Sequence, residues 1–321
     1  LTDVVAEIIV NTDNNTASKL IEEVSNIETE TNLSLKVISG ISEKDSEKLE
    51  SLSENNKETI EKLTEDAVEN AENTIEDSEL IAKVVSVAND DLANKVVQEV
   101  NKNAIEEKQT LSVKVLKAIV ETTPDKINDI DNVTKDEIID KAVETAKQQS
   151  EGSLTGEDVA NDVANIIINA DKDTANEVLQ KIDDTETDSK LSLNVFSGIT
   201  KQENFEEKLD TLSNEVVDSI IQKTVDKAEE EDTNIISDIL QNSDTSITTK
   251  IIDNAGENEE NQNIIINALS DTAKEDPDKA IKILEDSTKD TEGYNDLGLN
   301  EEGINDAGDY NVLYNEEASP S

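Results

Sequence analysis

The side chains best suited to chemistry in this sequence are carboxylates that crowd within a few residues of one another. Asp129, Asp131 and the pair Asp136-Glu137 form one such group, and Asp171 and Asp173 form another. Hard cations such as Ca²⁺ bind through several oxygen ligands. We therefore take Asp129, Asp131, Asp171 and Asp173 as the candidate metal ligands of the chain.

The spacing of the first group does not match a calcium-binding EF-hand loop. After Asp129 and Asp131 the next ligand position is Val133, and the glycine of the turn is missing. Counterions held loosely on a solvated acidic face account for the same residues. We expect no cofactor, with calcium or another divalent cation as the alternative.

Several kinds of chemistry are excluded because the chain has no Cys, Met, Trp or His. Without thiols and imidazoles it cannot form a structural zinc site, the usual iron–sulfur or haem ligation, or a Ser-His-Asp relay. Two carboxylates acting as general acid and base remain conceivable. Among 77 acidic residues such pairs arise by chance. We predict that the chain is not an enzyme.

The charge of the chain excludes two classes of partner. Its 77 Asp and Glu residues outnumber 28 Lys, which gives a formal net charge of −49. Nucleic acids and anionic membrane surfaces are bound through clustered Lys and Arg. The longest apolar runs are three or four residues, such as Ile264-Ile265-Ile266, far short of a bilayer span. We expect no nucleic acid and no membrane insertion.

The composition still supports a folded chain. Ile, Val, Leu and Phe make up 84 of the 321 residues, which is above the one-fifth level typical of disordered chains. They occur in short amphipathic blocks, such as Val4 to Val10 and Leu33 to Ile38, whose spacing fits one face of a helix. Short strands are the alternative, but the Asn-Gly or Asp-Gly turns of hairpins are missing.

The sequence repeats itself at an offset of 158 residues. Residues 33–41 (LSLKVISGI) match residues 191–199 (LSLNVFSGI), and residues 8–13 match residues 166–171 in the same register. This similarity indicates a duplication of the first half of the chain.

A weaker repeat lies inside each copy. At an offset of 76, Ile8 falls on Val84 and Asp13 falls on Asn89, and a fourth unit has Asp244 at the position of Asp13. The chain therefore consists of four units of roughly 75 residues, each made of helix pairs. A repeat of this kind predicts an all-α solenoid, in which each unit buries its apolar face only against its neighbours.

Signals for helix starts support this interpretation. Residues 134–137 and 174–177 both match the Ser/Thr-x-x-Glu capping box, which predicts helix N-caps at Thr134 and Thr174. Pro124 and Pro277 each follow a residue that can cap a helix, and each is expected at the first helical position.

The end of the second copy departs from the first. Pro124 matches Pro277 at an offset of 153, but the helix expected at residues 136–147 does not recur near residue 290. Glycines recur there every five residues instead. We predict an extended C-terminal arm over residues 291–321, with a flexible acidic tail as the alternative. Its apolar and aromatic side chains are the candidate assembly residues: Tyr294, Leu297, Leu299, Ile304, Tyr310 and Tyr314.

The repeats set the expected domain boundaries. These are a first copy at 1–150 (units 1–76 and 77–150), a connector at 151–157, a second copy at 158–290 (units 158–232 and 233–290), and the tail at 291–321. The chain begins at Leu1 without a signal-peptide pattern, so we interpret it as a processed product or an excised piece. We expect an extracellular or cell-surface location, with the cytoplasm as the alternative.

Paired helices in tandem resemble the general plan of HEAT and armadillo repeat proteins. That resemblance implies a scaffold or a binding surface. We predict a non-enzymatic structural protein that self-associates head to tail, through its C-terminal arm, into a filament or surface assembly. The alternative is a monomeric acidic scaffold that binds a basic peptide or protein.

Overall fold

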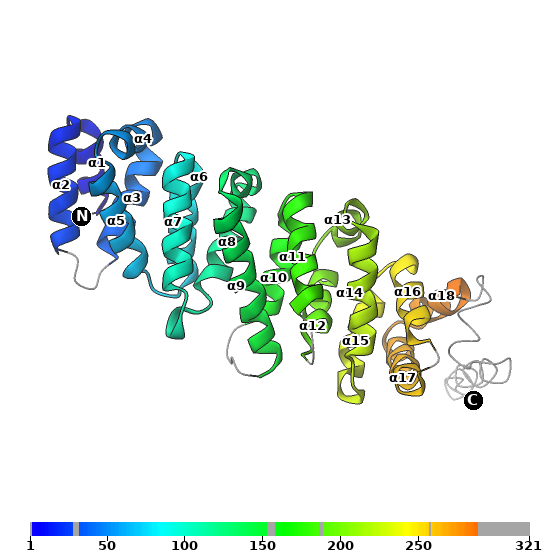
Figure 1. The fold of residues 1–321 in the computed structure, drawn as a ribbon. Helices are drawn as coiled ribbons and strands as arrows, with labels where there is room; N and C mark the ends of the chain where they lie inside the picture. The colour runs from blue at the N-terminus through cyan, green and yellow to red at the C-terminus, as the bar shows by residue number, and fades with distance from the viewer. Residues whose placement is uncertain (1, 28–31, 153–157, 186–188, 257, 288–321) are drawn as a thin grey trace, which may run out of the picture. The chain divides into compact units, whose positions relative to one another are not determined.

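The computed structural model describes residues 2–27, 32–152, 158–185, 189–256 and 258–287 (Figure 1). Every α-helix and 3₁₀-helix of these ranges alternates with short connections, and the described ranges contain no strand. The predicted all-α fold is confirmed, and the alternative of short strands is wrong for this part of the chain. None of the helices described is long and apolar enough to span a bilayer.

The helices form two compact units, with the boundary between residues 185 and 186. In each unit the first helix of a pair packs on the first helix of the next pair, and the second helices pack likewise. Each unit is therefore an α-solenoid with two layers of helices. The boundary falls after the first helix pair of the second sequence copy.

The first layer of the N-terminal unit consists of the opening helices of its pairs. They are α1 (Thr2–Asn11), α3 (Leu33–Lys44), α6 (Ile75–Val87), α8 (Leu111–Thr122) and α10 (Val159–Asn169). Neighbouring members contact each other in this order. The contact between α1 and α3 is close, because a Cβ atom added to Gly40 would lie 2.9 Å from the Cβ of Ala6. Glycine at this position lets the two backbones pack together.

The second layer of this unit contains the closing helices of the same pairs. They are α2 (Asn14–Ile27), α5 (Lys57–Glu69), α7 (Asp90–Asn103), α9 (Asn132–Ser150) and α11 (Lys172–Thr185). Three shorter elements lie between helices: α4 (Ser46–Asn55), η1 (Glu106–Lys108) and η2 (Pro124–Asp129). Apolar side chains between the layers, such as Ile21, Leu63 and Ile139, are fully buried.

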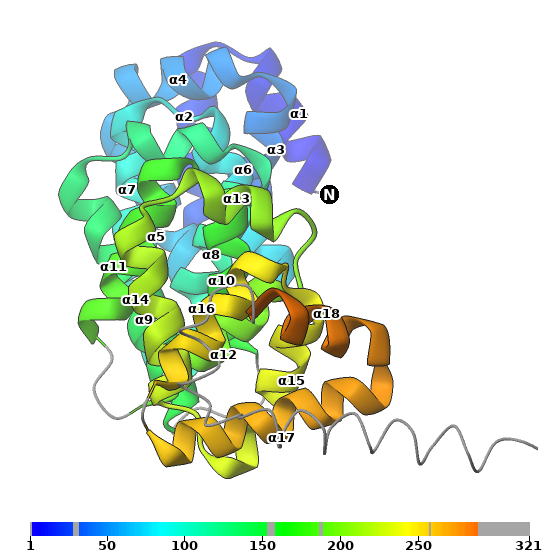
Figure 2. The same ribbon diagram turned by 90° about the vertical axis from the view of Figure 1, so that its right-hand side faces the viewer.

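The C-terminal unit repeats this plan. Its first layer is α12 (Leu191–Thr200), α15 (Thr233–Asn242) and α17 (Glu259–Glu275), and its second layer is α14 (Asn214–Asp226), α16 (Thr245–Ala255) and α18 (Pro277–Ser287). The short helices α13 (Phe205–Thr211) and η3 (Glu230–Asp232) connect them. Figure 2 shows α17 and α18, which pack on each other as the last described pair. Phe196 and Phe205 are buried in the core.

The sequence duplication is visible in the helix boundaries. Both ends of α2 recur in α11 at an offset of 158, and α1 and α10 end at matching residues. The C-termini of α8 and α17 match at an offset of 153. There the N–H of Thr123 donates to the carbonyl of Ile119 at 2.8 Å, and the N–H of Asp276 donates to that of Thr272 at 2.7 Å. Each sequence repeat of roughly 75 residues thus corresponds to two helix pairs of the structure.

The predicted capping boxes begin at the wrong residue. The N-cap of α9 is Asp131, three residues before Thr134, because the Asp131 carboxylate accepts the backbone N–H of Thr134. The same holds for Asp171 and Thr174 at the start of α11. The expected first-turn prolines are confirmed, since η2 begins at Pro124 and α18 at Pro277. The predicted C-terminal arm, residues 291–321, lies outside the described residues.

Candidate functional site

The candidate metal ligands Asp131 and Asp171 are helix caps. In each case the hydroxyl of the threonine three residues later donates to Oδ2 of the aspartate, at 2.8 Å from Thr134 and 2.7 Å from Thr174. Hydrogen bonds from Thr134 lower the pKa of Asp131 below its ordinary value. Burial acts to raise the pKa of Asp171, but the hydrogen bonds from Thr174, Asp173 and Asn128 together lower that pKa. Both carboxylates are therefore held ionised by the helix starts that they cap.

The other two candidates also have local roles. Asp129 forms an ion pair with Lys126 at 3.0 Å. Asp173 donates its backbone N–H to Oδ1 of Asp171 at 2.8 Å. No group of three or more acidic side chains that could hold a metal ion occurs in the part of the chain that the structure describes. The four candidates are not brought together around one point.

The capping aspartates follow a signal that the sequence did contain. The residues that recur through the four units, Asp13, Asn89, Asp171 and Asp244, each accept a backbone N–H at the start of a second-layer helix. The repeat predicts a shared role for this position, and the structure shows that the role is helix capping.

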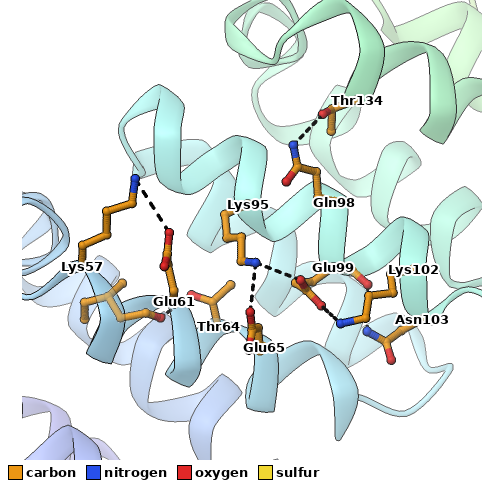
Figure 3. A network of polar contacts seen from close by, with 11 residues as sticks. Lys57, Glu61, Thr64, Glu65, Lys95, Gln98, Glu99, Lys102, Asn103 and Thr134 are labelled. Carbon is orange, nitrogen blue, oxygen red and sulfur yellow. Dashed lines mark hydrogen bonds and ion pairs between the residues drawn. The ribbon is translucent and has the colours of Figure 1, made fainter.

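An ion network centred on the buried Glu99 joins α5 to α7 (Figure 3). Lys95 Nζ lies 2.9 Å from Glu65 Oε1 and 3.1 Å from Glu99 Oε1, and Lys102 Nζ lies 3.1 Å from Glu99 Oε2. Burial acts to raise the pKa of Glu99, whose side chain is 7% exposed, but the two lysines lower it below its ordinary value. The hydrogen bond to Glu65 raises the pKa of Lys95. The network keeps its charges paired, so it holds two neighbouring helices together rather than supplying a reactive group.

A shallow groove lies beside this network. Its volume is about 230 Å³, and its walls are Ser53, Glu54, Lys57, Ile60, Glu61, Asn89, Asp91, Leu92 and Lys95. The amide of Asn89 crosses it to Ser53 Oγ at 3.0 Å. Pockets for organic cofactors are usually larger and mainly apolar. This groove is smaller, and most of the residues that line it are polar or charged.

The junction between the two sequence copies lies within the N-terminal unit and is crossed by ion pairs. In the first layer, Lys117 Nζ of α8 lies 2.6 Å from Asp162 Oδ1 of α10. In the second layer, Lys135 Nζ of α9 lies 3.0 Å from Glu177 Oε2 of α11. Lys181 Nζ of α11 lies 2.8 Å from Asp140 Oδ1 of α9 and forms a second ion pair between these helices. Burial raises the pKa of Glu177, and the hydrogen bond to Asp140 raises the pKa of Lys181.

The apolar part of the same junction is fully covered. Val113 and Val120 of α8 and Ile166 of α10 are at most 1% exposed. Ile166 corresponds to Ile8 of α1 at the offset of 158, and Val84 of α6 corresponds to Ile8 at the offset of 76. Val84 is only 1% exposed as well. At both internal positions the preceding first-layer helix covers this side chain.

The first helix presents the same position to solvent. Ile8 is 47% exposed, and Val4, one turn earlier on the same side of α1, is 55% exposed. Residues four apart lie on one face of a helix. We refer to Val4 and Ile8 as the α1 face. Sequence patterns alone did not single it out, because Ile8 and Ile166 belong to the same repeated motif.

Comparisons with known proteins do not identify a family for the chain. No family model matches the chain, and no curated protein matches it. Structural similarity was found to two engineered proteins whose crystal structures come from the Northeast Structural Genomics Consortium. One is 14% identical with a TM-score of 0.30, over 90% of this chain and 96% of that chain. The other is 13% identical with a TM-score of 0.24, over 92% and 97%. Similarity this low carries no argument about function.

Proposed function

We propose that the chain is a non-enzymatic structural repeat protein that self-associates head to tail into a filament or surface assembly. The chain has the architecture of a helical repeat protein. A closer likeness to HEAT and armadillo proteins is part of the proposal. An extracellular or cell-surface location belongs to the same proposal. Open helical assemblies arise when one surface of a molecule binds a different surface of the next copy.

The observation that supports the proposal most strongly is the recurrence of one stacking position, which is Ile8 in α1, Val84 in α6 and Ile166 in α10. Val84 and Ile166 are 1% and 0% exposed, so helices of this design pack on one another within the chain. A second copy of the chain supplies helix pairs of the same design, which can stack in the same way.

The predicted C-terminal arm is the second element of the proposal. Residues 291–321 carry the spaced side chains Tyr294, Leu297, Leu299, Ile304, Tyr310 and Tyr314. An extended segment with apolar residues at intervals can dock in a groove of a neighbouring molecule. In this proposal the arm adds to the contact between copies.

The experiment that tests the proposal is size-exclusion chromatography with light scattering over a wide range of protein concentration, followed by electron microscopy. We expect the mass to grow with concentration and the images to show linear or sheet-like particles. A chain that stays monomeric at every concentration and at moderate salt would contradict the proposal. In that case, binding of a lysine-rich peptide would support the alternative of a monomeric acidic scaffold.

A further inference from the structure

We infer that Asn32 and Asp77 form a proton-sensitive joint between the neighbouring first-layer helices α3 and α6, which tightens when Asp77 takes up a proton. The equivalent residues of the second sequence copy, Lys190 and Asp232, form a joint that closes without a proton. We refer to these pairs as the first-copy joint and the second-copy joint. The inference does not rest on the proposed self-association.

The two joints occupy equivalent positions in the two sequence copies. Asn32 and Lys190 are 158 residues apart, and they are the N-cap residues of α3 and α12. Asp77 and Asp232 are 155 residues apart, which is also the offset between the C-termini of α6 and α15. Each aspartate is the third residue of its element, α6 or η3. Both are buried, at 3% and 7% exposure.

The first-copy joint holds a buried carboxylate on neutral donors. Asp77 Oδ2 accepts the side-chain amide of Asn32 and the backbone N–H of Glu72, each at 2.6 Å. These donors satisfy the oxygen but bring no positive charge to it. An ionised carboxylate is costly to bury unless a cation is paired with it. The joint is therefore under a cost whenever Asp77 is ionised.

The charged groups around Asp77 leave this cost in place. Burial raises the pKa of the Asp77 carboxyl, and the charges of Glu72 and Glu76 act in the same direction. The backbone N–H of Glu72 and the charge of Lys36 on α3 act against them, but the pKa stays above its ordinary value. On the side of α8, Lys114 Nζ donates to a backbone carbonyl of the connection between α5 and α6 at 2.8 Å.

A proton removes the cost and keeps the contacts. It can reside on Oδ1 of Asp77, because Oδ2 of the neutral acid still accepts two donors. With a raised folded pKa, the cost of ionisation grows as the pH rises above the unfolded value of about 3.9, and it disappears as the pH falls. The contacts of Asp77 with Asn32 and Glu72 are therefore more stable in acid than at neutral pH.

The second-copy joint carries a cation at the position of Asn32. Lys190 Nζ lies 2.7 Å from Asp232 Oδ2, 2.8 Å from Glu229 Oε2 and 3.1 Å from Glu231 Oε1. Burial acts to lower the pKa of Lys190, but the hydrogen bonds to the three carboxylates raise it well above its ordinary value. Lys190 is then charged at acidic and neutral pH alike. Its ion pair with Asp232 closes this joint without a proton on the acid.

Hydrogen exchange of two matched backbone amides, measured by NMR on the full chain, tests both joints. The N–H of Lys36 donates to the carbonyl of Asn32, and the N–H of Asn194 donates to the carbonyl of Lys190, both at 3.0 Å. Each amide reports the opening of its joint. After correction for the intrinsic exchange rate, we expect the Lys36 amide to open about threefold less often at pH 4 than at pH 7. The Asn194 amide is expected to gain no protection in acid.

Two variants change the chemistry of one joint each. Asp77→Asn keeps an acceptor for both donors, and it is expected to protect the Lys36 amide at pH 7 and to abolish the response to acid. Lys190→Asn leaves three carboxylates without their cation, so we expect the Asn194 amide to open about threefold more often at pH 7 and to regain protection in acid. Lys274→Asn is the control, because it removes a lysine of the same unit whose side chain is 71% exposed.

The comparison of the wild type with Asp77→Asn is decisive by itself. If the Lys36 amide of the wild type opens equally often at both pH values, or if acid protects it as much in Asp77→Asn as in the wild type, Asp77 does not sense the proton and the inference is overturned. A folded Lys190→Asn variant that behaves like Lys274→Asn would overturn the equivalence of the two joints. Circular dichroism at both pH values shows whether each variant is folded.

Discussion

Lys117 of α8 and Asp162 of α10 form an ion pair with Nζ and Oδ1 2.6 Å apart, at the point where the second sequence copy follows the first. The side chains are 28% and 21% exposed. The pair therefore connects two repeats in a partly dry setting, where ion pairs are screened less than on the open surface. The contribution of this contact to stability can therefore be measured directly.

The first prediction concerns the energy of this pair. Replacing Lys117 by Met and Asp162 by Asn, singly and together, is expected to give a coupling energy of about 0.5–1 kcal/mol, near the upper end for partly exposed pairs. Urea unfolding of the four proteins measures it. Purely additive effects of the two replacements would show that the pair does not hold the junction.

The second prediction concerns the cap of α11. Asp171→Ala is expected to lower the free energy of unfolding by about 1 kcal/mol, because two backbone N–H groups lose their acceptor. Asp173→Ala is the control, since its side chain is exposed, and it is expected to change stability by less than about 0.5 kcal/mol.

The loss at Asp171 should depend on pH. Its pKa is lowered in the folded chain, so its contribution is present above the unfolded pKa of about 3.9 and disappears as the pH falls through the folded value. The difference between wild type and Asp171→Ala is therefore expected to be full at neutral pH and small at pH values well below 4. A difference that stays constant over this range would contradict the role of the ionised cap.

The third prediction concerns a buried acid with the opposite behaviour. Asp77 is 3% exposed, and its Oδ2 accepts the Asn32 amide and the Glu72 backbone N–H, both at 2.6 Å. Burial raises the pKa of the Asp77 carboxyl, while the Glu72 N–H acts against it. With a raised folded pKa, the ionised form costs stability as the pH rises above about 4.

Asp77→Asn keeps an oxygen that can accept both donors and removes the charge. We expect it to stabilise the chain at neutral pH, with a gain that disappears below about pH 4. Thermal melting at several pH values measures this. Asp77→Ala is the control and is expected to destabilise at every pH, because it leaves the two donors without an acceptor.

The repeat architecture could be predicted from the sequence, whereas most of the candidate surfaces could not. The pattern around Ile8 and Asp13 was enough to find the copies, because apolar spacing and cap positions recur along the chain. The capping boxes were misplaced because Thr134 has Glu137 three residues later, as the rule requires, whereas Asp131 has Thr134 at that position. In the structure its hydroxyl donates to the aspartate instead of accepting a backbone N–H.

The contacts between repeats were missed for a different reason. Lys95 and Glu65 are far apart in the sequence and pair only because α5 and α7 lie side by side. Rules for i, i+4 pairs apply to residues of the same helix, so they do not predict an ion pair between two helices. Likewise, Ile8 and Ile166 are indistinguishable in a sequence pattern, and only the stacking order decides which of them is covered.

The fourth prediction concerns the C-terminal arm. Deleting residues 291–321 is expected to weaken assembly, because it removes the spaced apolar side chains that are proposed to dock on a neighbouring copy. Light scattering and electron microscopy at matched concentration measure the effect. Replacing Tyr294, Tyr310 and Tyr314 by Ser in the full chain tests the contribution of these side chains alone, because the length and the charge of the arm stay the same. Unchanged assembly after the deletion would show that the arm has no part in it.

The fifth prediction concerns salt. Two copies with a formal net charge of −49 each repel one another, and this repulsion extends over about 10 Å at 0.1 M salt and over about 30 Å at 0.01 M.

Assembly is therefore expected to strengthen as salt rises, in the range where the coupling between Lys117 and Asp162 becomes weaker. The two opposite trends can be measured on the same protein, by light scattering for assembly and by urea unfolding of the double-mutant cycle for the pair. Adding a chelator at constant ionic strength tests the calcium alternative, and it is expected to leave assembly unchanged. Polymers that persist undiminished in dilute buffer would show that repulsion between copies does not limit assembly, because the acidic faces then lie far from the contact.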